Sequence, residues 1–303
     1  MIELAGVHFA HDGAPDLLTE LELRIAPGEV VAVEAAAGAG ATTLVRLLLG
    51  ELTARGRVAF AGRDVARLRS GSRAALRRRL GVVPQDLGLI GRDTALANVA
   101  LALEVCGVSS TAREARARAL LASVDVEPSL TVDRLSMAAR QRVAWARAVV
   151  RSPDALLADQ PTSHQDADGA ARFATLVGER AELGAACLVL TRDPHLIAAG
   201  ARLGWRMLAL HRTTLVDVIP VPEVPDVADS SAPVPVPVPV PRPTPELPVI
   251  PAAIAVSGAI DLPDIGPAGA TVDSGPIDID LDDLSAIPNV VPFPRARSAG
   301  NRR

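Results

Sequence analysis

Lysine and tyrosine are absent from this chain of 303 residues, so all 31 basic side chains are arginines. Aromatic residues are also scarce, with four phenylalanines and two tryptophans, and a folded core must therefore be mostly aliphatic. The two cysteines, Cys106 and Cys187, have neither disulfide nor metal-ligand spacing, and we expect both to be core residues. No apolar run approaches the roughly 18 residues of a membrane-spanning helix, so we expect no membrane span.

The net charge of −4 argues against a general nucleic-acid-binding protein. Residues 1–217 read as one α/β domain in which strands alternate with helices, a pattern typical of a parallel sheet. The predicted strands are 2–7, 21–25, 30–33, 57–60, 82–84, 155–159, 186–191 and a pair within 205–218, and the predicted helices are 42–49, 72–80, most of 94–151, 167–183 and 194–200.

The composition changes at residue 218. Eighteen of the 25 prolines lie between residues 220 and 294, and residues 232–245 alternate valine with proline. Proline lacks the N–H that a sheet requires and favours polyproline II geometry. An acidic apolar segment follows at 276–287, and the last residues are rich in arginine. We therefore expect residues 218–303 to be a disordered tail, either a passive spacer or a tether that docks on a partner.

The domain is organised around residues 30–50, which read VVAVEAAAGAGATTLVRLLLG. An apolar strand, a loop of small residues and an apolar-periodic helix follow one another, as a phosphate-binding loop requires. In the pattern G-x-x-x-x-G-K-[ST], Ala35 takes the first glycine, Gly40 the second, Ala41 the lysine and Thr42 the hydroxyl position. A tight turn between strand and helix, as in any doubly wound protein, is the competing interpretation.

Such a loop recognises phosphate through its backbone N–H groups and through a lysine side chain, and only the lysine contribution is missing here. Backbone N–H groups of the loop and of the helix N-terminus attract phosphate without a side chain, and Gly38 and Gly40 keep that backbone open. The ammonium group that would reach the β- and γ-phosphates is absent, and no lysine elsewhere can replace it. The nucleotide-contacting positions that this alignment predicts are Ala35, Gly38, Ala39, Gly40, Ala41, Thr42 and Thr43.

Four further segments resemble motifs of the ATP-binding cassette (ABC) proteins. Residues 81–86 (GVVPQD) resemble the Q-loop, and residues 135–150 (LSMAARQRVAWARAVV) resemble the signature helix. Residues 154–166 (DALLADQPTSHQD) resemble Walker B, the catalytic glutamate position and the D-loop, and residues 188–193 (LVLTRD) resemble the switch strand. Within the family, residues 76–109 look closest to the FtsE group of cell-division subunits, with lipoprotein-release and macrolide-export cassettes as near neighbours.

The resemblance implies a P-loop NTPase-type ABC nucleotide-binding domain of class α/β, with a mixed sheet core and a helical signature subdomain. It also exposes departures from the family. Gln160 stands at the catalytic glutamate, Arg192 at the switch histidine, and Met137 and Ala138 at the two signature glycines. His11 replaces the aromatic residue that stacks on adenine in the family.

Other positions keep the family pattern. Thr42, Gln85 and Asp159 are the oxygen ligands that the resemblance implies for Mg²⁺. The signature and dimer-facing positions that the resemblance implies are Leu135, Ser136, Met137, Ala138, Ala139 and Asp166. Arg192 adds a positive charge where the γ-phosphate would lie, and the alternative is that it is an ordinary surface residue.

The resemblance therefore implies an FtsE-like subunit that binds ATP and Mg²⁺ weakly or not at all, with hydrolysis absent or very slow. It implies a cytoplasmic protein, peripheral at the inner face of the cell membrane, with an FtsX-like integral membrane partner. It also implies pairing of two cassettes, as a homodimer or with an intact ABC subunit. Two alternatives stay open: a working ABC ATPase of the lipoprotein-release or macrolide-export type, and a scaffold that binds no nucleotide and acts through its tail.

Overall fold

A computed structural model describes residues 1–218 of the chain. The strands are β1 (Ile2–Ala10), β2 (Asp16–Ile25), β3 (Val30–Ala35), β4 (Arg55–Phe60), β5 (Arg63–Asp64), β6 (Leu80–Val83), β7 (Ala155–Asp159), β8 (Ala186–Thr191), β9 (Arg206–His211) and β10 (Thr214–Asp217). The helices are α1 (Ala41–Leu48), α2 (Ser70–Arg78), α3 (Ala95–Glu104), α4 (Ser110–Ser123), α5 (Met137–Val149), α6 (Ala167–Glu182) and α7 (Pro194–Arg202). Apart from Val218, the predicted disordered tail of residues 218–303 lies outside the described residues.

A six-stranded sheet forms the centre of this domain, in the order β10-β9-β3-β8-β7-β6. Its strands are parallel except for β10, which pairs with β9 in the antiparallel direction. All residues of β7 and β8 are buried, as expected for strands covered on both faces. The sheet brings the carboxyl ends of β3, β7 and β8 to one edge, which is where parallel α/β sheets bind ligands.

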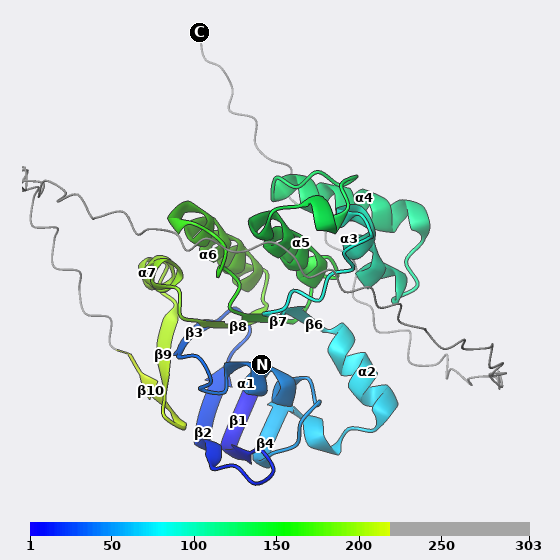
Figure 1. The fold of residues 1–303 in the computed structure, drawn as a ribbon. Helices are drawn as coiled ribbons and strands as arrows, with labels where there is room; N and C mark the ends of the chain where they lie inside the picture. Colours follow the sequence, from blue (N-terminus) through cyan, green and yellow to red (C-terminus); the bar gives the residue numbers. More distant parts are fainter. Residues whose placement is uncertain (219–303) are drawn as a thin grey trace, which may run out of the picture. The chain divides into compact units, whose positions relative to one another are not determined.

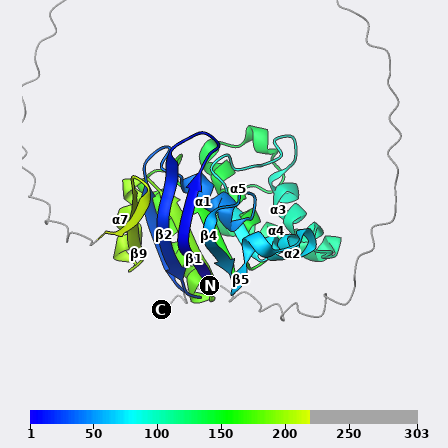
Figure 2. The same ribbon diagram turned by 90° about the horizontal axis from the view of Figure 1, so that it is seen from below.

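A second sheet is antiparallel, with the order β2-β1-β4-β5. Along β2, the buried Leu21, Leu23 and Ile25 alternate with the exposed Glu20 and Arg24 at the period of a strand with one covered face. Figure 2 shows this sheet from the side that faces away from the helices α5 and α6. The sequence predicted most of its strands but not their separation from the parallel sheet.

The parallel sheet lies between two apolar layers (Figure 1). Helices α5, α6 and α7 lie against one face, with α3 and α4 packed on α5, and α1 with the antiparallel sheet lies on the other face. Strand β3 contributes to both cores, since Val30 and Ala32 belong to the helical side while Val31 and Val33 belong to the side of α1. This arrangement fixes the start of α1 directly at the carboxyl edge of the sheet.

The predicted elements differ from the structure at a few places. Helix α2 ends at Arg78 rather than at residue 80, because Leu80 is buried and pairs with Ala155 as the first residue of β6. Cys187 is buried as expected, but Cys106 is exposed, since it lies in the turn that follows α3. Among residues 1–218, no helix is both long enough and apolar enough to cross a membrane.

Candidate nucleotide-binding site

The loop between β3 and α1 has the backbone form that phosphate binding requires. Gly38 and Gly40 adopt φ values of 78° and 103°, which disfavour residues with a side chain. A Cβ atom at Gly40 would also lie 3.0 Å from Leu18 Cδ2, so the Leu18 side chain would have to shift to admit it. Helix α1 begins at Ala41, and its first N–H groups have no partner within the helix. They give the loop a partial positive charge without any basic side chain.

Thr42 and Asp159 meet at the edge of the sheet. The Thr42 hydroxyl donates a hydrogen bond of 2.6 Å to Asp159 Oδ2, although 117 residues separate the two in sequence. Asp159 is only 2% exposed, and its Oδ1 atom has no hydrogen-bond partner among the described residues. Burial raises the pKa of Asp159 above its usual value, and the hydrogen bond from Thr42 partly opposes that rise.

This pair fits a magnesium ligand set. A hydroxyl and a carboxylate oxygen are hard donors of the kind that Mg²⁺ prefers, and the unpartnered Oδ1 is a buried polar atom that a cation would satisfy. Gln85, the third predicted ligand, lies just beyond the end of β6, which neighbours β7. Gln85 is exposed, and no hydrogen bond joins it to Thr42 or Asp159 in the described part of the chain.

Gln160 follows Asp159 and has an uncommon backbone conformation, with φ of 51°. Its N–H donates to Leu190 O at 2.9 Å, and its side-chain Oε1 accepts a 3.3 Å hydrogen bond from the N–H of Arg192. The Gln160 residue is buried, with 9% of its surface exposed. The structure therefore brings together the two residues that the sequence predicts at the catalytic-glutamate and switch-histidine positions, through the Gln160 side chain and the Arg192 backbone.

The Arg192 side chain itself is exposed and forms no ion pair within residues 1–218. Its neighbour Asp193 is fixed, because its carboxylate accepts from Thr162 Oγ1 at 2.5 Å and caps α7 through the N–H of His195. Arg192 thus extends from a rigid turn beside Gln160.

His11 lies in the turn after β1 and is exposed, and its ring is edge-on to Phe9 with 4.9 Å between the ring centroids.

The segment that resembles the signature is the first turn of α5. The Ser136 hydroxyl caps this helix by accepting from the N–H of Ala139 at 3.2 Å, and Leu135 O accepts from Arg140 Nε at 3.1 Å. Met137 is 42% exposed, so its side chain projects outward where the family has a glycine. Within the described residues, no hydrogen bond joins this turn to the loop between β3 and α1.

Sequence reasoning missed a polar network that holds this turn to the loop before α6. Gln165 Nε2 donates to Ala138 O at 2.9 Å and to Gln141 Oε1 at 3.1 Å, and Gln141 Nε2 donates to Ser163 Oγ at 2.9 Å. Asp166 closes the loop, since its Oδ1 accepts from the N–H of Gly169 at 2.8 Å and caps α6. Residue types alone offered no signal for these pairings.

Arg147 is a second residue that sequence reasoning did not assign. Its guanidinium donates to the carbonyl oxygens of Leu87 and Gly88, directly after Gln85 and Asp86. Leu87 and Gly88 have φ values of 60° and 51°, so two left-handed residues are held in place by one arginine of α5. Burial lowers the pKa of Arg147, and the nearby Asp86 opposes that change.

Comparisons with known proteins agree with this geometry. A family model described as ABC transporter matches residues 18–163. The cell division ATP-binding protein FtsE of Escherichia coli (strain K12) is 34% identical over 214 residues, which cover 69% of this chain and 95% of FtsE. The methionine import ATP-binding protein MetN of Xanthomonas campestris pv. campestris (strain 8004) is 37% identical over 212 residues. Those residues cover 68% of this chain but only 62% of MetN, less than two thirds of its length.

A solved structure is also similar to this chain. The dimeric structure of MJ0796, a bacterial ABC transporter cassette, has a TM-score of 0.66 at 27% identity and covers 72% of this chain and 99% of that one. Its post-hydrolysis state bound to ADP and Pi has a TM-score of 0.65. Given the match to nearly the whole of FtsE, and the loop, Thr42 and Asp159 at the edge of the sheet, the chain belongs to the ABC transporter family.

Proposed function

We propose that this chain is a catalytically degenerate, FtsE-like ABC subunit that holds Mg-ATP weakly or not at all and hydrolyses it extremely slowly. One observation carries the proposal: the Thr42–Asp159 pair and the glycine loop are kept, while Ala41, Gln160 and Arg192 stand where the family has charged or proton-accepting groups. The chain would act as a structural or regulatory coupler rather than as a motor.

Phosphoryl transfer depends on positioning and on charge stabilisation more than on covalent chemistry. The Ala41 methyl group cannot stabilise charge on the β- and γ-phosphates. A glutamine amide is not a general base at neutral pH, and the Gln160 amide oxygen is already engaged by the N–H of Arg192. Removing one such group typically lowers the rate by a factor of about 10²–10³, so the joint loss leaves hydrolysis near background even if the effects are not additive.

The similarity to FtsE along 95% of its length supports a role at the inner face of the cell membrane, on an FtsX-like integral membrane protein. The solved structure of similar fold is a dimer, which supports pairing of two cassettes. In a homodimer, both nucleotide sites would carry the substitutions. In a heterodimer with an intact ABC subunit, one site would combine the partner's complete loop with the Ser136–Ala139 turn of this chain.

Two measurements test the nucleotide part of the proposal. Phosphate release with saturating Mg-ATP should not exceed that of the Asp159→Ala variant, and a clear excess would establish a working ATPase instead. Calorimetric titration with ATP should show weak binding that falls when EDTA removes Mg²⁺. The Ala41→Lys variant should bind ATP more tightly by about 1–3 kcal/mol, the range of a charge-assisted contact. If Ala41→Lys still binds no nucleotide, the scaffold interpretation is favoured.

A further inference from the structure

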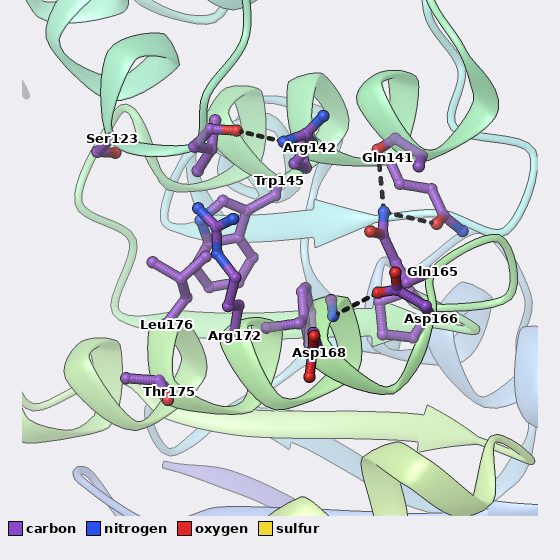
Figure 3. Close-up of a pocket in the computed structure, with 15 residues that line it drawn as sticks. Ser123, Gln141, Arg142, Trp145, Gln165, Asp166, Asp168, Arg172, Thr175 and Leu176 are labelled. Atoms are coloured by element: carbon purple, nitrogen blue, oxygen red, sulfur yellow. Dashed lines mark hydrogen bonds between the residues drawn. The ribbon is translucent and has the colours of Figure 1, made fainter.

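A cavity of about 470 Å³ lies between α5 and α6, and its basic and acidic side chains balance (Figure 3). Two arginines and two aspartates line it, namely Arg142, Arg172, Asp166 and Asp168. The aromatic residues that line it, Trp145 and Phe173, are only 2% and 8% exposed and belong to the core. The cavity therefore does not select a ligand by charge, and the charge imbalance of this domain lies on another surface.

The segment of residues 55–79 has a large excess of positive charge. It contains nine arginines and a single acidic residue, Asp64, although the whole chain has a net charge of −4. The segment comprises β4, β5, the short 3₁₀ helix Val65–Arg67 and α2. An excess of one sign attracts partners of the opposite charge, to an extent that depends on how far nearby carboxylates neutralise it.

These elements fold together at one side of the domain. Strand β4 pairs with β5, and Arg79, which follows α2, has its guanidinium carbon 5.4 Å from the centroid of the Phe60 ring in β4. Within the segment, Arg73 of α2 also donates to Leu68 O at 3.1 Å. Figures 1 and 2 both show β4 and α2 on the same side of the domain. We call residues 55–79 the basic edge.

Carboxylates neutralise only part of the charge of the basic edge. Three of its arginines form ion pairs within residues 1–218: Arg57 with Glu3 at 4.0 Å, Arg67 with Asp64 at 3.3 Å and Arg79 with Asp154 at 2.6 Å. The nearby Glu51 is engaged by Arg46 at 3.4 Å. Six arginines of the basic edge therefore have no carboxylate partner in the described part of the chain.

The six arginines differ in what their guanidinium groups contact. Arg73 and Arg77 donate to Gly50 O and Leu49 O at 3.2 and 2.8 Å, and a carbonyl oxygen accepts such a bond without neutralising the charge. The other four are exposed, and their guanidinium groups form no hydrogen bond to the described residues: Arg55, Arg63, Arg69 and Arg78. The basic edge thus offers uncompensated charge and free N–H donors to a partner outside the domain.

We propose that the basic edge lies on the headgroups of a bilayer that contains anionic phospholipids. Guanidinium groups bind phosphate oxygens in a bidentate manner, and a lipid leaflet presents phosphates across a plane that several arginines reach together. Each basic side chain near such a surface contributes about a fivefold factor in affinity. The inference rests on the membrane location proposed above, and it adds a direct lipid contact to the contact with a protein partner.

A nucleic acid is the other common polyanion with closely spaced phosphates. Proteins that hold single strands stack the bases on aromatic side chains. Phe60, the one aromatic residue in the sequence of the basic edge, is only 2% exposed and offers no such surface. The net charge of −4 also opposes general binding to DNA, so these observations favour the lipid surface.

The test measures binding of the full chain to vesicles by co-sedimentation. Vesicles of phosphatidylcholine with about 30% phosphatidylglycerol should bind the chain at low salt, and vesicles of phosphatidylcholine alone should not, because only the former have a negative surface potential. Binding should fall steeply between about 0.05 and 0.5 M salt, since the Debye length shortens over that range. A lack of binding would overturn this inference alone, because a protein partner can hold a degenerate subunit at a membrane without lipid contact.

Two charge-matched variants locate the binding surface. The test variant combines three substitutions at the basic edge: Arg63→Gln, Arg69→Gln and Arg78→Gln. The control variant removes the same charge from exposed arginines elsewhere that form no ion pair within residues 1–218: Arg92→Gln, Arg202→Gln and Arg212→Gln. The test variant should bind anionic vesicles at least about tenfold more weakly than the wild type, and the control variant less than about threefold more weakly.

A smaller change and a competitor complete the experiment. Arg78→Gln alone should weaken vesicle binding about threefold to fivefold, as expected for one arginine at the surface. The inference is overturned if both vesicle types bind equally or if the control variant loses as much affinity as the test variant. It is also overturned if a DNA duplex displaces the chain from the anionic vesicles at an equal concentration of phosphate, since the basic edge would then be a nucleic-acid surface.

Discussion

The buried carboxylate of Asp159 leads to a prediction about stability in the absence of nucleotide. Asp159 is 2% exposed, Thr42 satisfies only its Oδ2 atom, and Oδ1 has no partner among the described residues. A charged group in that position lowers the stability of the folded state, because water solvates it fully in the unfolded chain. We therefore expect Asp159→Asn, which keeps the shape and the acceptor for Thr42, to stabilise the domain.

The magnitude follows from what the substitution removes and what it leaves. An unsatisfied buried polar group costs about 1–3 kcal/mol, and more when it is charged. The new amide N–H₂ group at the place of Oδ1 also lacks a partner, so it cancels part of the stabilisation that comes from removing the charge. A net increase of about 1–2 kcal/mol in the free energy of unfolding remains at pH 7. For a domain of this size, such an increase raises the Tm by about 2–8 °C.

The pH dependence of the free energy of unfolding shows whether the charged form of Asp159 is the destabilising one. Because the folded-state pKa of Asp159 is raised, the wild-type protein loses stability as the pH rises from the unfolded pKa through the folded one. The advantage of Asp159→Asn should therefore be absent in acid and grow over that same window. Saturating Mg-ATP should shrink the difference if the wild-type protein binds it, since a ligand stabilises only the chain that holds it.

Urea denaturation at several pH values, without nucleotide, is the measurement. Asp154→Asn is the matched control, because it removes an exposed carboxylate that pairs with Arg79 at 2.6 Å. That change should lower the free energy of unfolding by at most about 1 kcal/mol. A lower stability of Asp159→Asn than of the wild type at pH 7 would refute the reasoning and would mean that the carboxylate is satisfied in the native protein.

Three further outcomes are expected from single changes. In denaturation experiments, Gly40→Ala should destabilise the domain by about 2–3 kcal/mol and Gly38→Ala by only about 1 kcal/mol. The loss at Gly38 is smaller because a Cβ atom there meets no atom within 4 Å. Equal losses for the two variants would contradict this prediction. Gly178→Ala, in the interior of α6 with open space around it, should raise the free energy of unfolding by about 0.5–1 kcal/mol, and a loss would show an unrecognised contact. Iodoacetamide at pH 8 should modify Cys106 but not Cys187 in the native protein, because Cys187 is buried and burial raises its pKa to about 12; mass spectrometry should detect both adducts only after denaturation.

Much of the fold could be predicted because its signals are local. Apolar runs marked β7 and β8 with their observed bounds, and glycine, proline and polar breaks separated α3, α4 and α5. The nucleotide-loop prediction also rested on local pattern, and the structure agrees in backbone form: strand, two left-handed glycines and a helix that begins at Ala41. The residues that depart from the family were visible in the sequence for the same reason, since each occupies a fixed place in a short motif.

Other features depend on contacts between distant segments, which no local pattern records. The antiparallel sheet exists because β1 pairs with both β2 and β4, and the exposure of Cys106 depends on where α3 ends against its neighbours. Arg147 reaches Leu87 across 60 residues, and Gln165 reaches Ala138 across 27. A hydrogen bond of this kind depends on the packing of whole helices and strands. The sequence by itself therefore determined most of the elements and the form of the loop between β3 and α1, while only the tertiary structure decided the α5–α6 cavity and the network that borders it.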